Sequence, residues 1–135
     1  MLDASVLISA MIRPSGPPGQ ILVALFESQT FGLVLSPLIV AEVERAIRSR
    51  KLRPYLPDPS EALLFLGDTV AVADLVPDTG RAAGVCRDPG DDLVLSAAIE
   101  GLASVIVTGD HDLPALGEYE RIAILSPRRF LDVCG

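Results

Sequence analysis

The sequence contains few residues of the types that build disulfide or zinc sites. Only two of its 135 residues are cysteines, Cys86 and Cys134, and His111 is the single histidine. These numbers exclude a disulfide framework and a Cys-x-x-C metal or redox motif. We expect both thiols to be inert packing residues in a reducing compartment, and we interpret His111 as an exposed loop residue.

Long apolar runs and export signals are also absent. No apolar run approaches the roughly 18–20 residues that a membrane-spanning helix needs, and Met1-Leu2-Asp3 does not begin a signal peptide. We therefore expect a cytoplasmic protein that does not act at a membrane. Half of the residues are apolar and 4% are aromatic, a globular composition that fits a single domain over residues 1–135.

The charged residues are separated by sign along the chain. The formal net charge is −7, which argues against a protein that holds nucleic acid by overall attraction. Between Asp88 and Asp112 there are six acidic residues and no Lys or Arg, whereas between Arg45 and Arg53 there are five basic residues and no acid. Solvated surfaces usually mix the two signs. The acidic stretch differs from this pattern, because it contains no basic residue that could neutralise its charge locally.

Apolar periodicity predicts helices that alternate with short strands. A very short strand is expected to end at Asp3, and further strands are expected at 31–35, 72–76, 104–108 and 122–125. Helices are expected at 5–12, 20–29, 37–50, 60–70 and 91–102, and after Ser126-Pro127. Several of these helices start with a capping residue followed by proline. The alternating order predicts an α/β fold with a mostly parallel sheet.

This topology places four acidic residues at one edge of the sheet. Asp3 and Asp110 follow strands, Asp91 opens the helix before strand 104–108, and Glu42 lies in the helix after strand 31–35. Ligands of open parallel sheets bind at the carboxyl ends of the strands. Each acid also has an ordinary interpretation, as a turn residue, a solvated helix residue or a partner of a helix dipole. Their shared edge favours a common site.

Carboxylates that lie together need a cation, because each raises the pKa of the others and destabilises the fold. A site without Cys or His ligands suits Mg²⁺ or Mn²⁺ better than Zn²⁺. Such an ion polarises a phosphodiester and lowers the pKa of the water that attacks it. The acidic residues therefore predict metal-assisted phosphodiester hydrolysis.

The basic stretch is ordinarily interpreted as a solvated helix end. Arg45, however, follows Glu42 by one helical turn on the same face. Arg45 and Arg48 are therefore candidates for binding the phosphates of a nucleic acid.

Four segments of the chain resemble PIN domains, and among them the VapC-like toxin components of toxin–antitoxin pairs. The resemblance covers nearly the whole chain, in order. Its most specific part is Asp88-Pro89-Gly90-Asp91-Asp92, followed one helix and one strand later by Thr108-Gly109-Asp110. The other segments begin at Leu2-Asp3-Ala4-Ser5 and Ser36-Pro37, and Ala4 stands where the family often has Thr.

The resemblance implies a doubly wound, mostly parallel sheet of about five strands flanked by helices, and a Mg²⁺- or Mn²⁺-dependent endoribonuclease. It also implies RNA as substrate, a cognate antitoxin that packs over the site, and a homodimer. Asp91 aligns better than Asp88 or Asp92 as the third acid of the site. The implied catalytic residues are Asp3, Glu42, Asp91 and Asp110, the metal ligands Asp3, Asp91, Asp110 and Asp112, and the supporting hydroxyls those of Ser5 and Thr108.

Two other functions compete with this interpretation. A phosphoaspartate enzyme or receiver domain needs a lysine near a strand end, but the single lysine, Lys51, lies at the end of a predicted helix. The second alternative is a non-catalytic PIN-like module that binds RNA or a partner protein. The acidic net charge and the high apolar content favour it, whereas the presence of all four acids of the site opposes it.

Overall fold

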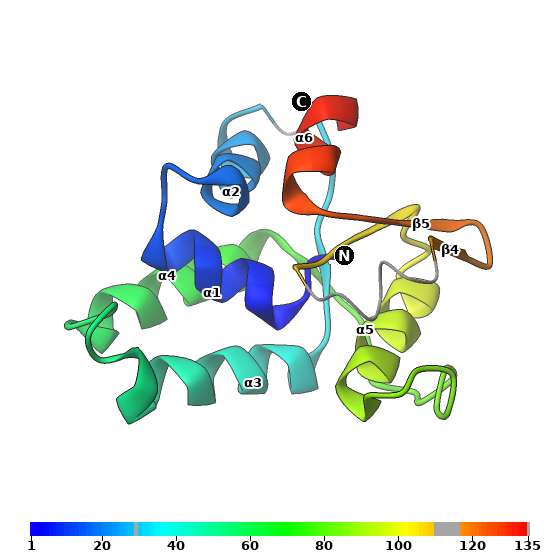
Figure 1. Cartoon of the computed structure of the whole chain (residues 1–135), viewed down its shortest axis with the longest axis horizontal. Coiled ribbons are helices and arrows are strands. Elements are labelled where there is room, and N and C mark those ends of the chain that lie inside the picture. Colours follow the sequence, from blue (N-terminus) through cyan, green and yellow to red (C-terminus); the bar gives the residue numbers. More distant parts are fainter. Residues whose placement is uncertain (29, 110–116, 135) are drawn as a thin grey trace.

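The computed structural model describes residues 1–28, 30–109 and 117–134. Short strands separate groups of one to three helices along the described chain (Figure 1). All of the helices expected from the sequence are found, and so are the expected strands apart from the first one, with ends that shift by a few residues. The strand β4 and the short 3₁₀ helix η1 were not predicted. In chain order the elements are α1 (Ala4–Ile12), α2 (Pro17–Glu27), β1 (Val34–Leu35), α3 (Pro37–Arg48), η1 (Arg50–Leu52), α4 (Pro59–Val72), β2 (Asp74–Leu75), α5 (Pro89–Glu100), β3 (Val105–Val107), β4 (Glu118–Tyr119), β5 (Ile122–Leu125) and α6 (Pro127–Cys134).

Four helices, α3, α4, α5 and α6, start with a side-chain cap followed by proline. The Ser36 hydroxyl accepts the N–H of Ile39 at the start of α3, and the Asp58 carboxylate caps α4 in the same manner. At α5, the carboxylate of Asp88 accepts the N–H of Gly90 at 2.9 Å. Proline suits the next position because its fixed φ is helical and no backbone donor is needed there. These local signals explain why the starts of α3, α4 and α6 could be predicted, whereas α5 begins at Pro89, two residues before the predicted Asp91.

The strands form two small sheets. β1 pairs in parallel with β2, and a second sheet has the order β3-β5-β4, in which β3 and β5 are parallel and β4 is antiparallel. The expected first strand is reduced to a parallel bridge between Leu2 and Val107. The α/β class and the parallel pairs are as predicted, but the described residues do not form the single five-stranded sheet. The strands are only two to four residues long, and such short strands make few ladder hydrogen bonds.

The core fixes α1 between its neighbours. α1 contacts both α2 and α3, and α5 contacts β1 and β3 (Figure 1). Leu7 of α1, Ile39 of α3 and Leu95 of α5 are almost completely buried. Burying a side chain of this size contributes about 1.5–3 kcal/mol. This packing holds the first turns of α1 and α5, where the predicted acids lie. In the part of the chain that the structure describes, no helix is long and apolar enough to cross a membrane.

Candidate active site

Asp3 is held firmly at the start of α1. It is the N-cap of this helix, and its Oδ1 accepts the N–H of Val6 at 3.0 Å and the hydroxyl of Ser5 at 2.7 Å. Its Oδ2 accepts the hydroxyl of Thr108, which lies at the end of β3. The Asp3 side chain is therefore fixed by donors from two parts of the chain. The contact with Ser5 has the geometry expected of a supporting hydroxyl.

The direct hydrogen bond from Thr108 was not anticipated as a contact with Asp3. It follows from the parallel bridge beside it, in which the N–H of Asp3 donates to the carbonyl of Val107 at 3.2 Å. This pairing brings the end of β3 next to the N-cap of α1. Thr108 is fully buried, so its hydroxyl lies within the protein rather than in solvent. A bridge between residues this far apart in sequence has no local sequence signal.

A cavity of about 260 Å³ lies at this edge, and four acidic residues border it. Asp3, Glu42 and Asp91 were predicted to meet here, and the structure places all three on the cavity wall. Asp88 is the fourth acid. Asp3 and Asp91 are each only 6% exposed, whereas Glu42 and Asp88 are exposed. The cavity thus combines two buried carboxylates with two that are accessible to solvent.

Two further predicted ligands cannot be placed in this cavity. Asp110 and Asp112 lie outside the described residues, as does His111. Gly109, which directly precedes Asp110 in the sequence, borders the cavity.

Asp91 and Asp92 have different surroundings although they are neighbours in the first turn of α5. Asp92 is not on the cavity wall. Its carboxylate accepts the N–H of Cys86 at 2.7 Å and that of Gly84 at 2.8 Å. The N–H of Cys86 holds the pKa of Asp92 below its ordinary value; burial opposes this effect, and the N–H of Gly84 adds to it. The sequence left Asp88 and Asp92 as alternatives to Asp91 for the third acid of the site. Asp88 borders the cavity, whereas Asp92 accepts hydrogen bonds from the backbone of the loop before α5.

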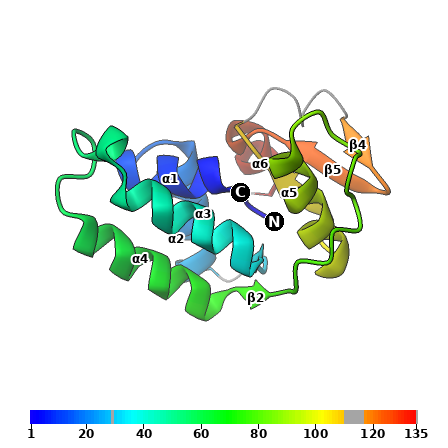
Figure 2. The same cartoon turned by 90° about the horizontal axis from the view of Figure 1, so that it is seen from below.

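Three polar side chains of α5, those of Asp92, Ser96 and Glu100, bind the loop between β2 and α5. The Ser96 hydroxyl accepts the N–H of Ala82 at 2.9 Å, and Glu100 lies 2.6 Å from the guanidinium of Arg81. Figure 2 shows the chain between β2 and α5 running along this helix. The spacing of four residues places the three polar side chains on one helical face. This spacing is a sequence signal that could have revealed the contact.

The same loop also reaches the start of α3. The Asp78 carboxylate accepts the N–H of Leu38 at 2.9 Å in the first turn of that helix. The loop therefore joins the starts of the two helices that supply Glu42, Asp88 and Asp91 to the cavity.

The donor chemistry of the cavity fits a hard divalent cation. Its acids offer only oxygen ligands, which Mg²⁺ and Mn²⁺ prefer. Among the residues that the structure describes, no three His, Cys, Asp or Glu side chains are already arranged around one metal position. Asp3 and Asp91 are the buried acids on the wall that could hold such an ion.

The predicted phosphate-binding arginines lie outside the cavity. Arg45 and Arg48 are exposed on α3, and the guanidinium of Arg48 lies 3.5 Å from the carboxylate of Glu44. An exposed pair of this kind contributes only about 0.3–0.5 kcal/mol, so it would yield readily to a phosphate. Neither arginine borders the acidic cavity.

Comparison with known proteins identifies the family. Residues 1–112 match the PIN domain family. The chain is a PIN domain. It is also 33% identical, over 141 aligned positions, to an uncharacterized protein of Methanocaldococcus jannaschii, and the alignment covers 98% of this chain and 88% of that protein. No solved structure gives a significant match.

Membership of this family sets the general chemistry of the site. PIN domains are in general nucleases that act on RNA and use divalent metals such as Mg²⁺. The match extends from the start of the chain through Asp112 and so includes each acidic residue that was predicted for the site.

Proposed function

We propose that this PIN domain is an endoribonuclease that hydrolyses RNA phosphodiesters with Mg²⁺ or Mn²⁺. The observation that supports this most strongly is the meeting of Asp3, Glu42, Asp88 and Asp91 on one cavity wall. Asp3 and Asp88 are the N-caps of α1 and α5, and Glu42 and Asp91 lie within α3 and α5. Asp3 accepts three hydrogen bonds, so its carboxylate is preorganised to bind a cation or water.

The acids have separate roles in this proposal. Asp3 and Asp91 would hold the metal from the wall of the cavity, and Asp110 and Asp112 would complete its ligands. A bound Mg²⁺ would polarise the phosphodiester and lower the pKa of a water molecule. The exposed Glu42 is suited to accept the proton that this water loses on attack. Ser5 and Thr108 keep the Asp3 carboxylate from rotating away.

The proposed substrate is single-stranded RNA or the loop of a folded RNA. Unstacked strands expose their phosphodiesters and can enter a shallow acidic cavity, whereas a duplex presents a rigid backbone. Arg45 lies one turn beyond Glu42 on an exposed face of α3. We assign Arg45 and Arg48 to the RNA backbone, where their charges would offset the repulsion between phosphates and the acidic cavity.

We further propose that the enzyme is the toxin of a type II toxin–antitoxin pair, with a cognate antitoxin and a homodimeric state. The resemblance of four segments to VapC-like proteins supports this, as does the number of large apolar side chains left on the surface, including Val23, Leu64 and Val72. A short reading frame directly upstream that encodes a protein able to suppress RNA cleavage would support the pairing.

Cleavage of a labelled single-stranded RNA under different metal conditions tests the enzymatic proposal. Mg²⁺ or Mn²⁺ should support cleavage, EDTA should abolish it, and Zn²⁺ should substitute poorly because the ligands are oxygens. Binding of both metal and RNA without any cleavage would instead favour the non-catalytic PIN-like module.

A further inference from the structure

The basic residues of this acidic chain are concentrated at the end of α3 and just beyond it. Of the 11 Lys and Arg residues, five fall between positions 45 and 53, namely Arg45, Arg48, Arg50, Lys51 and Arg53. All five side chains are exposed. We call residues 50–55, which follow α3 and include η1, the basic tip.

The helix dipole explains only part of this charge. Arg45 and Arg48 lie in the last turn of α3, where basic side chains interact favourably with the end of the dipole. Arg50, Lys51 and Arg53 come after the last residue of α3, where this effect has fallen off. Among the residues that the structure describes, no acidic side chain forms an ion pair with these three. Their charges are therefore available to an anionic ligand.

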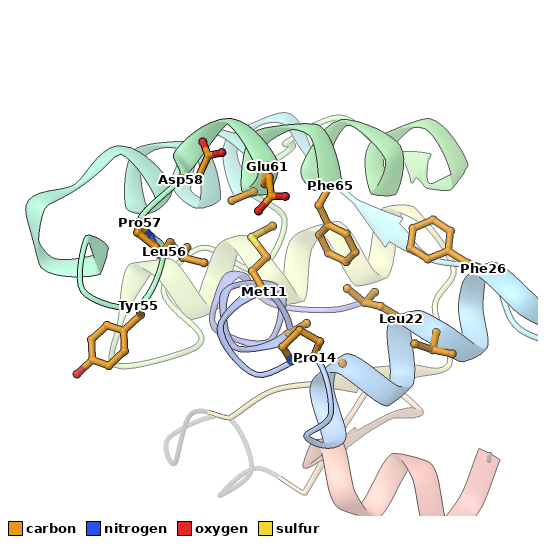
Figure 3. Close-up of a pocket in the computed structure, with 14 residues that line it drawn as sticks. Met11, Pro14, Leu22, Phe26, Tyr55, Leu56, Pro57, Asp58, Glu61 and Phe65 are labelled. Atoms are coloured by element: carbon orange, nitrogen blue, oxygen red, sulfur yellow. The ribbon is translucent and has the colours of Figure 1, made fainter.

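Tyr55 is the aromatic side chain that this protein leaves most exposed. Its exposed fraction is 62%, whereas the other five aromatic residues, which all lie in the described part of the chain, are buried or half-buried. Figure 3 shows the ring of Tyr55 pointing away from α4, where Asp58 and Glu61 lie. A ring whose face is open to solvent can stack on a nucleobase, because every base has a π-face.

The basic tip holds Tyr55 on a fixed turn. The N–H groups of Tyr55 and Leu56 both donate to the carbonyl of Leu52, at 3.0 and 2.7 Å. The N–H of Arg53 donates to the carbonyl of Arg50 at 3.2 Å. Leu56 is buried and Leu52 packs against the core, so these two side chains anchor the turn. A ring held in this manner loses little conformational entropy when it binds a ligand.

α3 connects the basic tip with the acidic cavity. Glu42 borders the cavity, and a helix rises about 1.5 Å per residue, so Arg48 lies about 9 Å along α3 from Glu42. Figure 1 shows that α3 starts near α5 and ends on the far side of the molecule, where the basic tip follows. A single strand that runs from the cavity along the exposed arginines of α3 would therefore reach Tyr55. Such a path fits the roughly 4–16 nucleotides that single-strand binding sites cover.

We propose that the basic tip is a second contact site for single-stranded RNA, in which Tyr55 stacks on a nucleobase and the three basic side chains bind neighbouring phosphates. This inference rests on the proposed function for its substrate and goes beyond it, because it places the RNA strand away from the point of cleavage. An acidic protein segment would satisfy the basic residues, but it offers no nucleobase to the exposed ring. The contact does not involve the reacting phosphodiester, so it should affect KM rather than kcat.

Fluorescence anisotropy of a labelled single-stranded RNA of about 12 nucleotides measures this contact. The protein is Asp3→Asn in EDTA, so that no cleavage interferes with binding. Tyr55→Ala in this background should weaken binding at least about fivefold, the lower end of the loss expected for one stacked base. Tyr55→Phe keeps the ring and should bind like the parent protein. Leu64→Ala, which removes an exposed apolar side chain outside the tip, is the matched control and should have no effect.

A second RNA distinguishes stacking from a structural effect of the substitution. An oligonucleotide of the same length with abasic positions keeps its phosphates but lacks the nucleobases. Tyr55→Ala should bind this RNA as tightly as the parent protein does, because no base is left to stack. An equal loss of affinity for both RNAs would show that Tyr55 acts only through the shape of the tip, and it would overturn the proposal.

The salt dependence of binding tests the phosphate contacts. Lys51→Ala and Arg53→Ala should each reduce the slope of log K against log salt concentration by about 0.7, the value for one phosphate of a single strand. Arg128→Ala, at an exposed position of α6, is the control and should leave the slope unchanged. Unchanged slopes in both variants of the tip would contradict the proposal.

Two competing results are distinct from the expected one. Displacement of the RNA by a poly-Glu peptide of equal charge would make the tip a docking site for an acidic protein. Equal binding of an RNA duplex would show that phosphates alone are recognised. Either result overturns the proposal. Binding is measured without metal and without the Asp3 carboxylate, so its failure is distinguishable from a failure of the nuclease proposal. With Asp3 restored, Tyr55→Ala should raise KM for RNA cleavage and leave kcat unchanged.

Discussion

The hydroxyl of Thr108 donates a hydrogen bond to the carboxylate of Asp3, although 105 residues separate them in sequence. Thr108 directly follows β3 and Asp3 caps α1, so this hydrogen bond joins the end of a strand to the start of a helix at the acidic cavity. Both side chains are buried, with Asp3 only 6% exposed. We infer that the Thr108 hydroxyl helps to fix the orientation of the carboxylate.

Thr108→Val should lower the free energy of unfolding by about 1–3 kcal/mol. The variant keeps the shape of the side chain but removes a donor from a buried charged acceptor. Thr108→Ser, which keeps the hydroxyl, is the matched control and should lose less. Urea unfolding of the three proteins gives the comparison, and equal losses in Val and Ser variants would show that the hydroxyl does not matter.

Asp92→Asn should destabilise the fold near neutral pH, because the amide cannot accept both the Gly84 and the Cys86 N–H groups as the carboxylate does. The pKa of Asp92 is lowered in the folded protein. Its stabilisation is therefore complete above the unfolded-state pKa, about 3.9, and is lost as pH falls through the folded-state value. The gap in unfolding free energy between wild type and variant should shrink below about pH 4.

Urea unfolding between pH 3 and pH 7 measures this gap. Asp68→Asn, at an exposed position of α4, is the control and should follow the wild type closely. A gap for Asp92→Asn that stays constant down to pH 3 would contradict the role of the carboxylate.

Mg²⁺ or Mn²⁺ should raise the melting temperature, since a cation that binds only the folded state stabilises it. The gain is about 2.7 kcal/mol at a metal concentration of 100 times Kd. Asp91→Asn should reduce this response. It should also raise metal-free stability, because it removes one of several like charges on the cavity wall. Asp132→Asn, on the exposed side of α6, is the control, and an equal metal response in all three proteins would exclude Asp91 as a ligand.

Gly19 permits a close approach between α2 and the chain before it. A Cβ built at this residue would lie 1.9 Å from the carbonyl oxygen of Pro14, a backbone atom that cannot move aside on its own. Gly19→Ala should therefore destabilise the fold by about 1–3 kcal/mol. Gly67→Ala is the matched control within α4, where the added Cβ meets nothing within 4 Å, and it should stabilise by about 0.5–1 kcal/mol. Thermal unfolding distinguishes the two outcomes.

Local signals explain which parts of this structure could be predicted. Ser36-Pro37 and Asp58-Pro59 start helices through contacts within a few residues, so the sequence alone locates α3 and α4. The meeting of Asp3, Glu42 and Asp91 follows from the order of strands and helices. Strand β4 was missed because only two residues pair, and the two-residue turn that joins it to β5, Glu120-Arg121, lacks the Asn, Asp or Gly that usually marks a hairpin.

The different surroundings of Asp88, Asp91 and Asp92 were not predictable in the same way. Adjacent residues of a helix point in directions about 100° apart, so any of the three could have faced the cavity. The contacts of the loop with Ser96 and Glu100 set the rotation of α5 against its surroundings. These contacts direct Asp92 to the backbone of Gly84 and Cys86 and leave Asp91 at the cavity.

RNA cleavage by wild type and Asp3→Asn from parallel purifications tests the central claim most directly. Asn keeps the shape of Asp3 and its N-cap oxygen but removes the charge that a metal requires. Loss of an outer-shell partner already costs about 10–100-fold, so the loss of this ligand should reduce the Mg²⁺-dependent rate by at least about 100-fold. Asp132→Asn should cleave like the wild type. Equal cleavage by wild type and Asp3→Asn would contradict the account, because the activity would then not depend on the acidic cavity.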